Sequence, residues 1–419
     1  MINRVRAYIE REIGLGTNSH VLIALSGGAD STALLLIMKE LGYMLEALHC
    51  NFHLRGEESN RDQTFVEEFC KEQAVPLFVR HFNTEEVAKK RGISIEMAAR
   101  DLRYDWFREE LKARKATCVA VAHHRDDQAE TLLLNLVRGT GLRGLAGMQA
   151  KHDGIIRPLL CMSRQEILDY LKSRGQSYVT DSTNSERIAE RNRIRLDVIP
   201  LLQSINPSAV EHLLLASENV QESLPYYMKG IETAFKEQDI TANEFPLSAL
   251  TSSTLLHEWL RGKGFNQAQE EDILQSSKTQ PGKMWHSKSY TILLDRQALL
   301  LSPLNREIVV PLIKQEIVPH IEETGPNVAY FDADLLASSI EVRRVREGDV
   351  FVPFGMKGRK LVSDYLTDRK LNRLEKAETF VATCDEDIIW LIGHRSDNRY
   401  RVTDKTSRIL KLSVANSKT

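Results

Sequence analysis

One stretch of the sequence decides the fold: Val21-Leu22-Ile23-Ala24-Leu25-Ser26-Gly27-Gly28-Ala29-Asp30-Ser31. It continues into a second aliphatic run, so the pattern predicts a strand, a tight turn and a helix. Gly27 and Gly28 allow a sharp turn, and they let the backbone approach a ligand closely because no Cβ intervenes. The helix that follows directs its unpaired N–H groups and its positive dipole end at the same spot, which favours phosphate.

The turn also contains three polar side chains. Ser26 and Ser31 add hydroxyl donors, whereas Asp30 adds a carboxylate, which repels phosphate unless a cation such as Mg²⁺ lies between them. The stretch therefore predicts a cradle for a metal-bound polyphosphate, and it lacks the lysine that follows the glycines in kinases and GTPases. The alternative is an ordinary strand-to-helix turn in which serine and aspartate serve as helix caps.

Composition bounds the class of protein. The chain has 419 residues, 42% of them hydrophobic and 27% charged, which is typical of a soluble protein with two or three domains. The longest wholly aliphatic run, residues 33–38, is too short to span a bilayer, and the first residues predict a charged amphipathic helix rather than a signal peptide. Five scattered cysteines argue against a disulfide scaffold, a zinc knuckle or a C-x-x-C redox site. We expect a cytoplasmic protein with no membrane partner.

The first half of the chain alternates between strand-like and helix-like segments, which predicts a parallel sheet with helices on both faces. The predicted strands are Val21–Leu25, Leu45–Cys50, Leu77–Phe82, Thr117–Ala122 and, more weakly, Ile155–Leu160, and the clearest helices are Arg61–Gln73 and Ile95–Arg114.

The texture of the sequence changes at Asn206. The predicted helices there are Ala209–Ala234, Leu247–Lys263 and Ala268–Ser276, followed by a hairpin over Trp285–Leu301, a proline-punctuated stretch and a mixed, strand-rich segment over Val328–Thr403. We therefore divide the chain into an α/β domain (1–205), a mainly helical middle domain (206–305), a linker (306–327) and a small α+β domain (328–419).

A second polar cluster follows the strand predicted to end at Ala122. It reads His123-His124-Arg125-Asp126-Asp127-Gln128-Ala129-Glu130-Thr131. In open α/β sheets ligands bind beyond the carboxyl ends of the strands, which is where this cluster falls. Asp126 or Asp127 can cap the next helix, and Asp127 and Glu130 would then share one face.

Two carboxylates and a histidine at this place could hold a metal, orient an amine or act as a general base. The alternative is a capping box between Asp127 and Glu130, which needs no chemistry.

Two further patterns carry less information. Gly139-Thr140-Gly141-Leu142-Arg143-Gly144 spells a dinucleotide-binding fingerprint but follows a predicted helix, so we interpret it as a helix end that leads into a loop. The net charge of −2 does not favour nucleic acid, but basic residues gather in two regions. These are residues 341–376, with Lys357, Arg359 and Lys360 among ten basic residues, and the cluster Arg187, Arg191, Arg193 and Arg195.

Taken in order, these motifs resemble the PP-loop ATP pyrophosphatases and, more narrowly, the bacterial tRNA(Ile)-lysidine synthetases. The resemblance covers most of the chain, and beyond the two clusters it rests on these stretches: Asn51-Phe52-His53-Leu54-Arg55 with Ser59 and Asp62, Ala99-Arg100-Asp101-Leu102-Arg103-Tyr104, Asp181-Ser182-Thr183-Asn184, Arg191-Asn192-Arg193-Ile194-Arg195, Glu347-Gly348-Asp349, Pro353-Phe354-Gly355 and Gly393-His394-Arg395. Cys50 and the order Phe52-His53 depart from the family pattern, so no role is carried over to His53.

The resemblance implies a PP-loop (adenine nucleotide α-hydrolase-like) fold and a ligase that uses ATP and Mg²⁺. Such enzymes join free L-lysine to carbon 2 of the wobble cytidine of tRNA(Ile) with a CAU anticodon, through an adenylated intermediate, and release AMP and pyrophosphate. The middle and carboxyl-terminal domains would bind tRNA, and the oligomeric state, monomer or homodimer, stays open.

The resemblance also suggests roles for individual residues. Nucleotide binding falls to Ser26, Gly27, Gly28, Ala29, Asp30 and Ser31, metal binding to Asp30, lysine binding and catalysis to Asp127, Glu130 and His123, and phosphate or tRNA binding to Arg100, Arg103, Arg191 and Arg195. Surface salt bridges are the alternative for Arg100 and Arg103, and which of Asp126, Asp127 and Glu130 meets metal or lysine stays open.

Two rival functions remain. One is a PP-loop enzyme of another branch, although thiolating members need a cysteine pair and amide-forming members a glutaminase unit, for which the sequence shows no motif. The other is a non-catalytic RNA-binding protein, which would require neither polar cluster.

Overall fold

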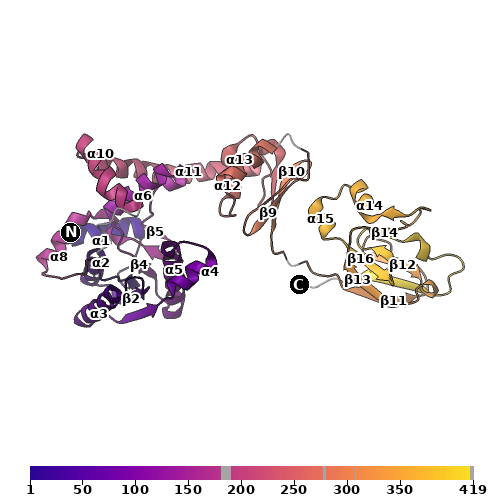
Figure 1. Cartoon of the computed structure of the whole chain (residues 1–419), viewed down its shortest axis with the longest axis horizontal. Helices are drawn as coiled ribbons and strands as arrows, with labels where there is room; N and C mark the ends of the chain where they lie inside the picture. The colour runs from indigo at the N-terminus through magenta and orange to yellow at the C-terminus, as the bar shows by residue number, and fades with distance from the viewer. Residues whose placement is uncertain (181–189, 277–279, 307, 416–419) are drawn as a thin grey trace. The chain divides into compact units, whose positions relative to one another are not determined.

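The computed structural model describes residues 1–180, 190–276, 280–306 and 308–415. The chain forms two compact units, residues 1–228 and 229–419, and the boundary between them lies within the long helix α11 (Ala209–Glu237). Figure 1 shows the elements of both units coloured along the chain. Residues 181–184 and Arg187, which the sequence analysis singled out, lie outside the described residues.

A six-stranded sheet forms the centre of the first unit, in the order β3-β2-β1-β4-β6-β5. Its strands are β1 (His20–Ala24), β2 (Met44–Asn51), β3 (Leu77–His81), β4 (Cys118–Ala120), β5 (Lys151–His152) and β6 (Ile155–Ile156). All neighbours pair in parallel except β5 with β6. The predicted parallel sheet is thus confirmed, but the strand expected over 155–160 is short because Pro158 starts a 3₁₀ turn.

Helices cover both faces of this sheet, as Figure 1 shows around β2 and β4. The helices of the first unit up to residue 205 are α1 (Ile2–Tyr8), α2 (Ala29–Glu40), α3 (Glu57–Glu72), α4 (Thr84–Arg91), α5 (Ile95–Arg114), α6 (Arg125–Val137), α7 (Leu142–Leu145), α8 (Arg164–Ser173), α9 (Glu190–Arg193) and α10 (Ile199–Ile205). Successive residues of β1 point to opposite faces. Val21 and Ile23 pack with α2 and α3, whereas Leu22 packs with Trp106 and Phe107 of α5.

The strand order places two loops side by side. The chain runs outward from β1 to β2 and β3, then returns to add β4 on the other side of β1. The order therefore reverses between β1 and β4, and ligands of doubly wound sheets bind beyond the carboxyl ends of the strands at such a reversal. The loops after β1 and β4 are the two polar clusters of the sequence.

The second unit begins with a small antiparallel sheet in the order β7-β10-β9-β8. Its elements are β7 (Glu244–Pro246), α12 (Ser253–Leu260), α13 (Gln267–Gln275), β8 (Met284–His286), β9 (Tyr290–Leu294) and β10 (Ala298–Pro303). Strands β9 and β10 are the predicted hairpin. Helix α12 starts later than predicted, because Ser252 accepts a hydrogen bond from Leu255 N and so caps the helix there.

The remainder of the second unit is rich in short strands, as predicted. Three sheets run β11-β19-β12, β13-β16-β17-β18 and β14-β15. Their elements are β11 (Ile313–Val318), β12 (Val328–Asp332), β13 (Ile340–Arg344), β14 (Val350–Phe351), β15 (Lys360–Leu361), α14 (Val362–Asp368), α15 (Arg373–Ala377), β16 (Phe380–Cys384), β17 (Asp387–Leu391), β18 (Arg395–Ser396) and β19 (Ile409–Val414).

The stretch 306–327, predicted as a linker, contains strand β11. This strand pairs with the distant β19, and Pro311 and Pro319 flank it rather than interrupt it. The division of the chain into four parts stays a prediction. In the described parts of the chain, no helix combines the length and the apolar character needed to cross a bilayer.

Candidate active site

The turn after β1 is closed by its own polar groups. The hydroxyl of Ser31 donates to Gly28 O at 3.0 Å and accepts from Ser26 N at 3.2 Å, and the hydroxyls of Ser26 and Ser31 lie 3.1 Å apart. Helix α2 begins directly after Gly28, which is its N-cap residue. The backbone N–H groups of the first turn therefore converge on the space beside the two hydroxyls, which is the predicted arrangement for phosphate.

Gly27 is required at its position for two reasons. Its φ of +89° lies in a region that L side chains rarely adopt, and a Cβ would lie only 3.2 Å from Val66 Cγ2 and 3.3 Å from a ring carbon of Phe65. Both of these side chains come from α3. On the opposite side Val179 N donates to Gly27 O at 2.9 Å. The turn is therefore held between α3 and the segment at Val179.

Helix α6 begins two or three residues earlier than predicted. Its N-cap is His124, whose N–H donates to Asp127 Oδ2 at 3.0 Å, while Asp127 N donates to His124 Nδ1 at 3.4 Å. The expectation that Asp126 or Asp127 is the cap is wrong, because Arg125 already begins the helix. The capping box joins His124 to Asp127, not Asp127 to Glu130, which leaves Glu130 free for tertiary contacts.

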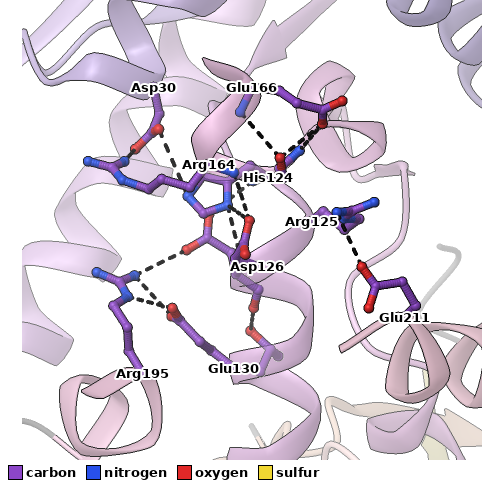
Figure 2. Close-up of polar contacts among 12 residues, drawn as sticks. Asp30, His124, Arg125, Asp126, Glu130, Arg164, Glu166, Arg195 and Glu211 are labelled. Atoms are coloured by element: carbon purple, nitrogen blue, oxygen red, sulfur yellow. Dashed lines mark hydrogen bonds and ion pairs between the residues drawn. The ribbon is translucent and has the colours of Figure 1, made fainter. Parts of the chain in front are cut away.

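His124 lies at the centre of three carboxylates (Figure 2). Its Nε2 is 3.4 Å from Asp127 and 3.9 Å from Asp30, and its Nδ1 is 3.5 Å from Asp126. Burial opposes protonation, but the bond to Asp126 and the charges of Asp127 and Asp30 outweigh it and raise the pKa of His124. Nδ1 accepts the Asp127 amide proton when the ring is neutral, and it faces Asp126 when the ring is protonated.

Asp126 connects α6 to α8. It accepts Arg164 N at 2.7 Å, and although burial opposes its ionisation, the bonds from His124 and from this backbone N–H lower its pKa to about 2. The Arg164 side chain turns the other way and pairs with Oδ2 of Asp30 (Figure 2). Asp126 therefore fixes the place of an arginine that contacts the phosphate-binding turn.

Asp127 and Glu130 share one face of α6, as predicted, and two arginines join them. Arg191 bonds Asp127 Oδ1 at 3.0 Å and Glu130 Oε2 at 2.7 Å, while Arg195 bonds both oxygens of Glu130 at 2.5 and 3.0 Å. The Glu130 side chain is 1% exposed, and the arginines are about one-third exposed. The structure thus brings four of the predicted site residues into one ion-pair network.

His123 precedes this network and is suited to remain neutral. Burial and the nearby charges of Arg157, Arg191 and Arg100 lower its pKa to about 4, although Asp127 acts in the opposite direction. Its Nδ1 is buried and has no hydrogen-bond partner in the described structure. At neutral pH this imidazole is therefore uncharged, and one ring nitrogen carries a free lone pair.

A cavity of about 350 Å³ joins the two loops. Among its lining residues are Ser26, Gly28, Asp30, Ser31, His123 and Asp127, together with the apolar side chains Leu48, Phe52 and Phe107. A lining that combines apolar and aromatic side chains with a few polar groups is typical of a small-molecule site. The described lining of this cavity does not include Glu130, Arg191 or Arg195, and Arg191 is connected to it by its bond to Asp127.

The two arginines predicted on α5 differ in their placement. Arg103 lines the cavity, with its guanidinium 5.4 Å from the centre of the Phe52 ring. Arg100 lies 4.9 Å from the ring centre of Tyr104, a residue that also lines the cavity. The alternative interpretation was a surface ion pair for each arginine. Among the described residues, neither Arg100 nor Arg103 forms one.

The residues at Asp30 fit a divalent cation. Its Oδ1 is buried and has no hydrogen-bond partner in the described part of the chain. No group of three or more histidine, cysteine or acidic side chains among those described is placed to hold a metal by itself. One carboxylate beside a phosphate cradle is the donor set that Mg²⁺ uses when the substrate's phosphates supply further oxygens.

The cysteine in the cavity is not a nucleophile. Cys50 lines the cavity wall, and burial raises the pKa of its thiol to about 12. Since the thiolate is the reactive form, this thiol is inert at neutral pH. Burial therefore disfavours a nucleophilic role for this cysteine.

Two residues of the site were not found from the sequence. The predicted motif contained His124 without a role, and no motif contained Arg164, which lies 134 residues from its partner Asp30. His124 could be recognised as a helix cap only once the first residue of the helix, Arg125, was known. For Arg164 the sequence carries no signal.

A doubly wound sheet with a glycine-rich turn after β1 and a nucleotide-sized cavity beside it is the architecture of a PP-loop ATP-dependent enzyme. The profile described as "PP-loop domain" matches residues 2–202, and the profile described as "TilS substrate binding domain" matches residues 243–304.

Near full-length relatives define the family. The chain is 45% identical to the tRNA(Ile)-lysidine synthase of Bacteroides thetaiotaomicron, covering 97% of this chain and 98% of the relative. It is 41% identical to that of Parabacteroides distasonis, covering 98% and 99%, and 38% identical to that of Porphyromonas gingivalis, covering 96% of each. The chain belongs to the tRNA(Ile)-lysidine synthase family of ATP-dependent ligases, which confirms the resemblance seen in the sequence.

Proposed function

We propose that this enzyme joins free L-lysine to carbon 2 of the wobble cytidine in tRNA(Ile) with a CAU anticodon. The observation that carries the proposal is that the glycine-rich turn after β1 lines one cavity together with His123 and Asp127 of the cluster after β4. In the first step the cytidine O2 attacks the α-phosphorus of ATP and pyrophosphate leaves. In the second step the lysine ε-amine attacks carbon 2, loses a proton and expels AMP.

The residues of the cradle support the first step. The hydroxyls of Ser26 and Ser31 and the N–H groups of α2 would hold the leaving pyrophosphate. Mg²⁺ bound at Asp30 would neutralise charge that develops on the phosphates. Arg164, held against Asp30 by Asp126, adds a fixed positive charge on the same side.

The cluster after β4 supports the second step. Asp127 lines the cavity and would bind the lysine ammonium, whereas Glu130 is buried behind it and would act by holding Arg191 and Arg195. Neutral His123 would accept the proton that the amine loses. Replacing Asp127 with Asn should raise the KM for lysine, and an unchanged KM and kcat would remove this assignment.

The basic surface of the carboxyl-terminal region would hold the tRNA backbone. Changing Lys357, Arg359 and Lys360 together to Glu should weaken tRNA affinity and flatten its dependence on salt. An unchanged salt slope would assign this surface to another kind of partner.

The central experiment incubates the protein with α-labelled ATP, Mg²⁺ and a tRNA(Ile) transcript with the CAU anticodon, with and without ¹⁴C-lysine. The expected result is lysine-dependent AMP release with lysine fixed in the tRNA. A transcript with uridine at the wobble position is the matched control and should accept no lysine. ATP cleavage without lysine transfer would indicate another nucleophile, and no cleavage would indicate a binding protein.

A further inference from the structure

A second cavity lies in the carboxyl-terminal part of the chain, and among the described residues it shares no lining residue with the cavity between the loops after β1 and β4. It has a volume of about 530 Å³, and its walls include Tyr330, Phe354, Trp390, His394, Arg395 and Ser396. Two of the sequence motifs without a role, Pro353-Phe354-Gly355 and Gly393-His394-Arg395, meet here. The cavity is large enough for a nucleotide, since small-molecule sites typically measure about 300–1,000 Å³.

Phe354 and Arg395 lie next to each other in the cavity wall, and we call this pair the platform. The guanidinium carbon of Arg395 lies 5.6 Å from the centre of the Phe354 ring, and its Nε and Nη2 donate to Phe354 O at 3.3 and 3.2 Å. The Phe354 side chain is 45% exposed. An exposed phenyl ring with an arginine over it leaves planar surface for another ring to stack on.

This platform is anchored from below by a buried carboxylate. Asp397 is fully buried and accepts Val352 N at 2.8 Å, and it also pairs with Arg399 at 3.0 Å. Phe354 N donates to Ser396 O at 2.9 Å, which ties the Phe354 loop to β18. The platform is therefore held in place before any ligand arrives, and little ordering entropy is lost on binding.

The charge of the walls favours an electron-rich or anionic ligand. The described residues that line the cavity include His394 and Arg395 but no carboxylate. Burial and the nearby charge of Arg369 lower the pKa of His394, so its ring is neutral at neutral pH and can both donate and accept hydrogen bonds. Neutral donor–acceptor groups beside a stacking platform match the edge of a nucleobase.

We propose that this cavity binds an unpaired nucleobase, stacked on Phe354 and Arg395, with His394 at its edge. The inference rests on the proposed function in one respect, namely that an RNA is the substrate of this enzyme. The base could belong to a single-stranded part of the tRNA or to a free mononucleotide, because both present the same ring.

The test uses the fluorescence of 2-aminopurine, which stacking quenches, on the full-length protein with a non-hydrolysable ATP analogue saturating the PP-loop site. The probe is placed in turn at the unpaired positions of the tRNA outside the anticodon, and separately supplied as 2-aminopurine riboside monophosphate. We expect quenching at one tRNA position, and Phe354→Leu should remove that quenching and weaken binding by about 5- to 100-fold.

Two variants keep the test decisive. Phe354→Tyr retains the ring and should restore quenching, and Leu335→Ala alters an equally exposed apolar residue that does not line the cavity, so it should change nothing. Quenching of the mononucleotide alone would assign the site to a free nucleotide. Equal quenching in wild type and Phe354→Leu, or none with any probe, would overturn the proposal. Because the readout needs no turnover, its failure is distinct from an absence of lysine transfer.

Discussion

The two loops at the carboxyl ends of β1 and β4 line one cavity but are held in different ways. The loop after β1 is closed by bonds among its own residues, Ser26, Gly28 and Ser31. The cluster after β4 is held by the guanidinium groups of Arg191 and Arg195 and by the backbone N–H of Arg164, all from distant segments. The loop after β1 owes its shape mainly to its own backbone, with packing from α3 and one bond from Val179 N, whereas carboxylates buried together need charges brought from elsewhere.

The largest expected effect comes from removing the charge at the point where both loops meet. Asp30→Asn keeps the shape of the side chain but removes the anion that would bind Mg²⁺ beside the phosphates, so kcat for lysine-dependent AMP release should fall by about 10²- to 10³-fold. Steady-state rates over a series of Mg²⁺ concentrations measure this.

A matched control for Asp30→Asn is Asp105→Asn, which alters an ion-paired carboxylate of α5 remote from the cavity. It should leave the rate unchanged. A wild-type rate and Mg²⁺ dependence in Asp30→Asn would show that the cradle works without its aspartate.

Glu130→Gln tests whether the cluster after β4 depends on its distant partners. Glutamine cannot neutralise the two guanidinium groups, so the free energy of unfolding should fall by about 1–3 kcal/mol. Urea unfolding followed by circular dichroism measures it, with the exposed Glu96→Gln of α5 as the control. If the two variants are equally stable, the arginines do not hold the cluster.

The pH dependence of stability sharpens the comparison through His123. Its pKa is about 4 in the folded protein and about 6.5 when unfolded, so the unfolded chain binds more protons between these values and stability falls as the pH falls. From pH 6.5 to pH 5 this histidine should cost about 2 kcal/mol of unfolding free energy. The variant His123→Gln lacks this titrating group, so its unfolding free energy should fall by about 2 kcal/mol less than that of the wild type between pH 6.5 and pH 5. An equal fall in both proteins would contradict the burial of a neutral His123 ring.

The smallest effect is expected from the backbone of the loop after β1. Gly27→Ala places a Cβ at a positive φ and against Val66, so it should lower the free energy of unfolding by about 1 kcal/mol. Gly28→Ala is the matched control for stability, because its Cβ would make only ordinary contacts of 3.6 Å or more. Thermal unfolding of both variants separates backbone strain at Gly27 from the general effect of replacing a glycine with alanine. Equal melting temperatures would exclude strain at Gly27.

Sequence reasoning succeeded where the signal is local. The strands β1 to β3, the helix α5 and the hairpin of β9 and β10 follow from hydrophobic periodicity and turn residues. It was wrong about the cap of α6, because histidine is not among the usual capping residues and the helix start depends on where β4 ends. It also missed β11 as a strand, because its partner β19 lies about 90 residues further along the chain.

The sequence alone determined the family, the parallel sheet and the glycine-rich turn between β1 and α2, since these follow from motifs of a few adjacent residues. Only the tertiary structure decided that Glu130 is buried under two arginines while Asp127 reaches the cavity. It alone brought Arg164 to Asp30 and joined Phe354 to Arg395 in one platform. The physical reason is that a charge's role depends on its burial and its partner, and both are set by chain segments that the local sequence cannot specify.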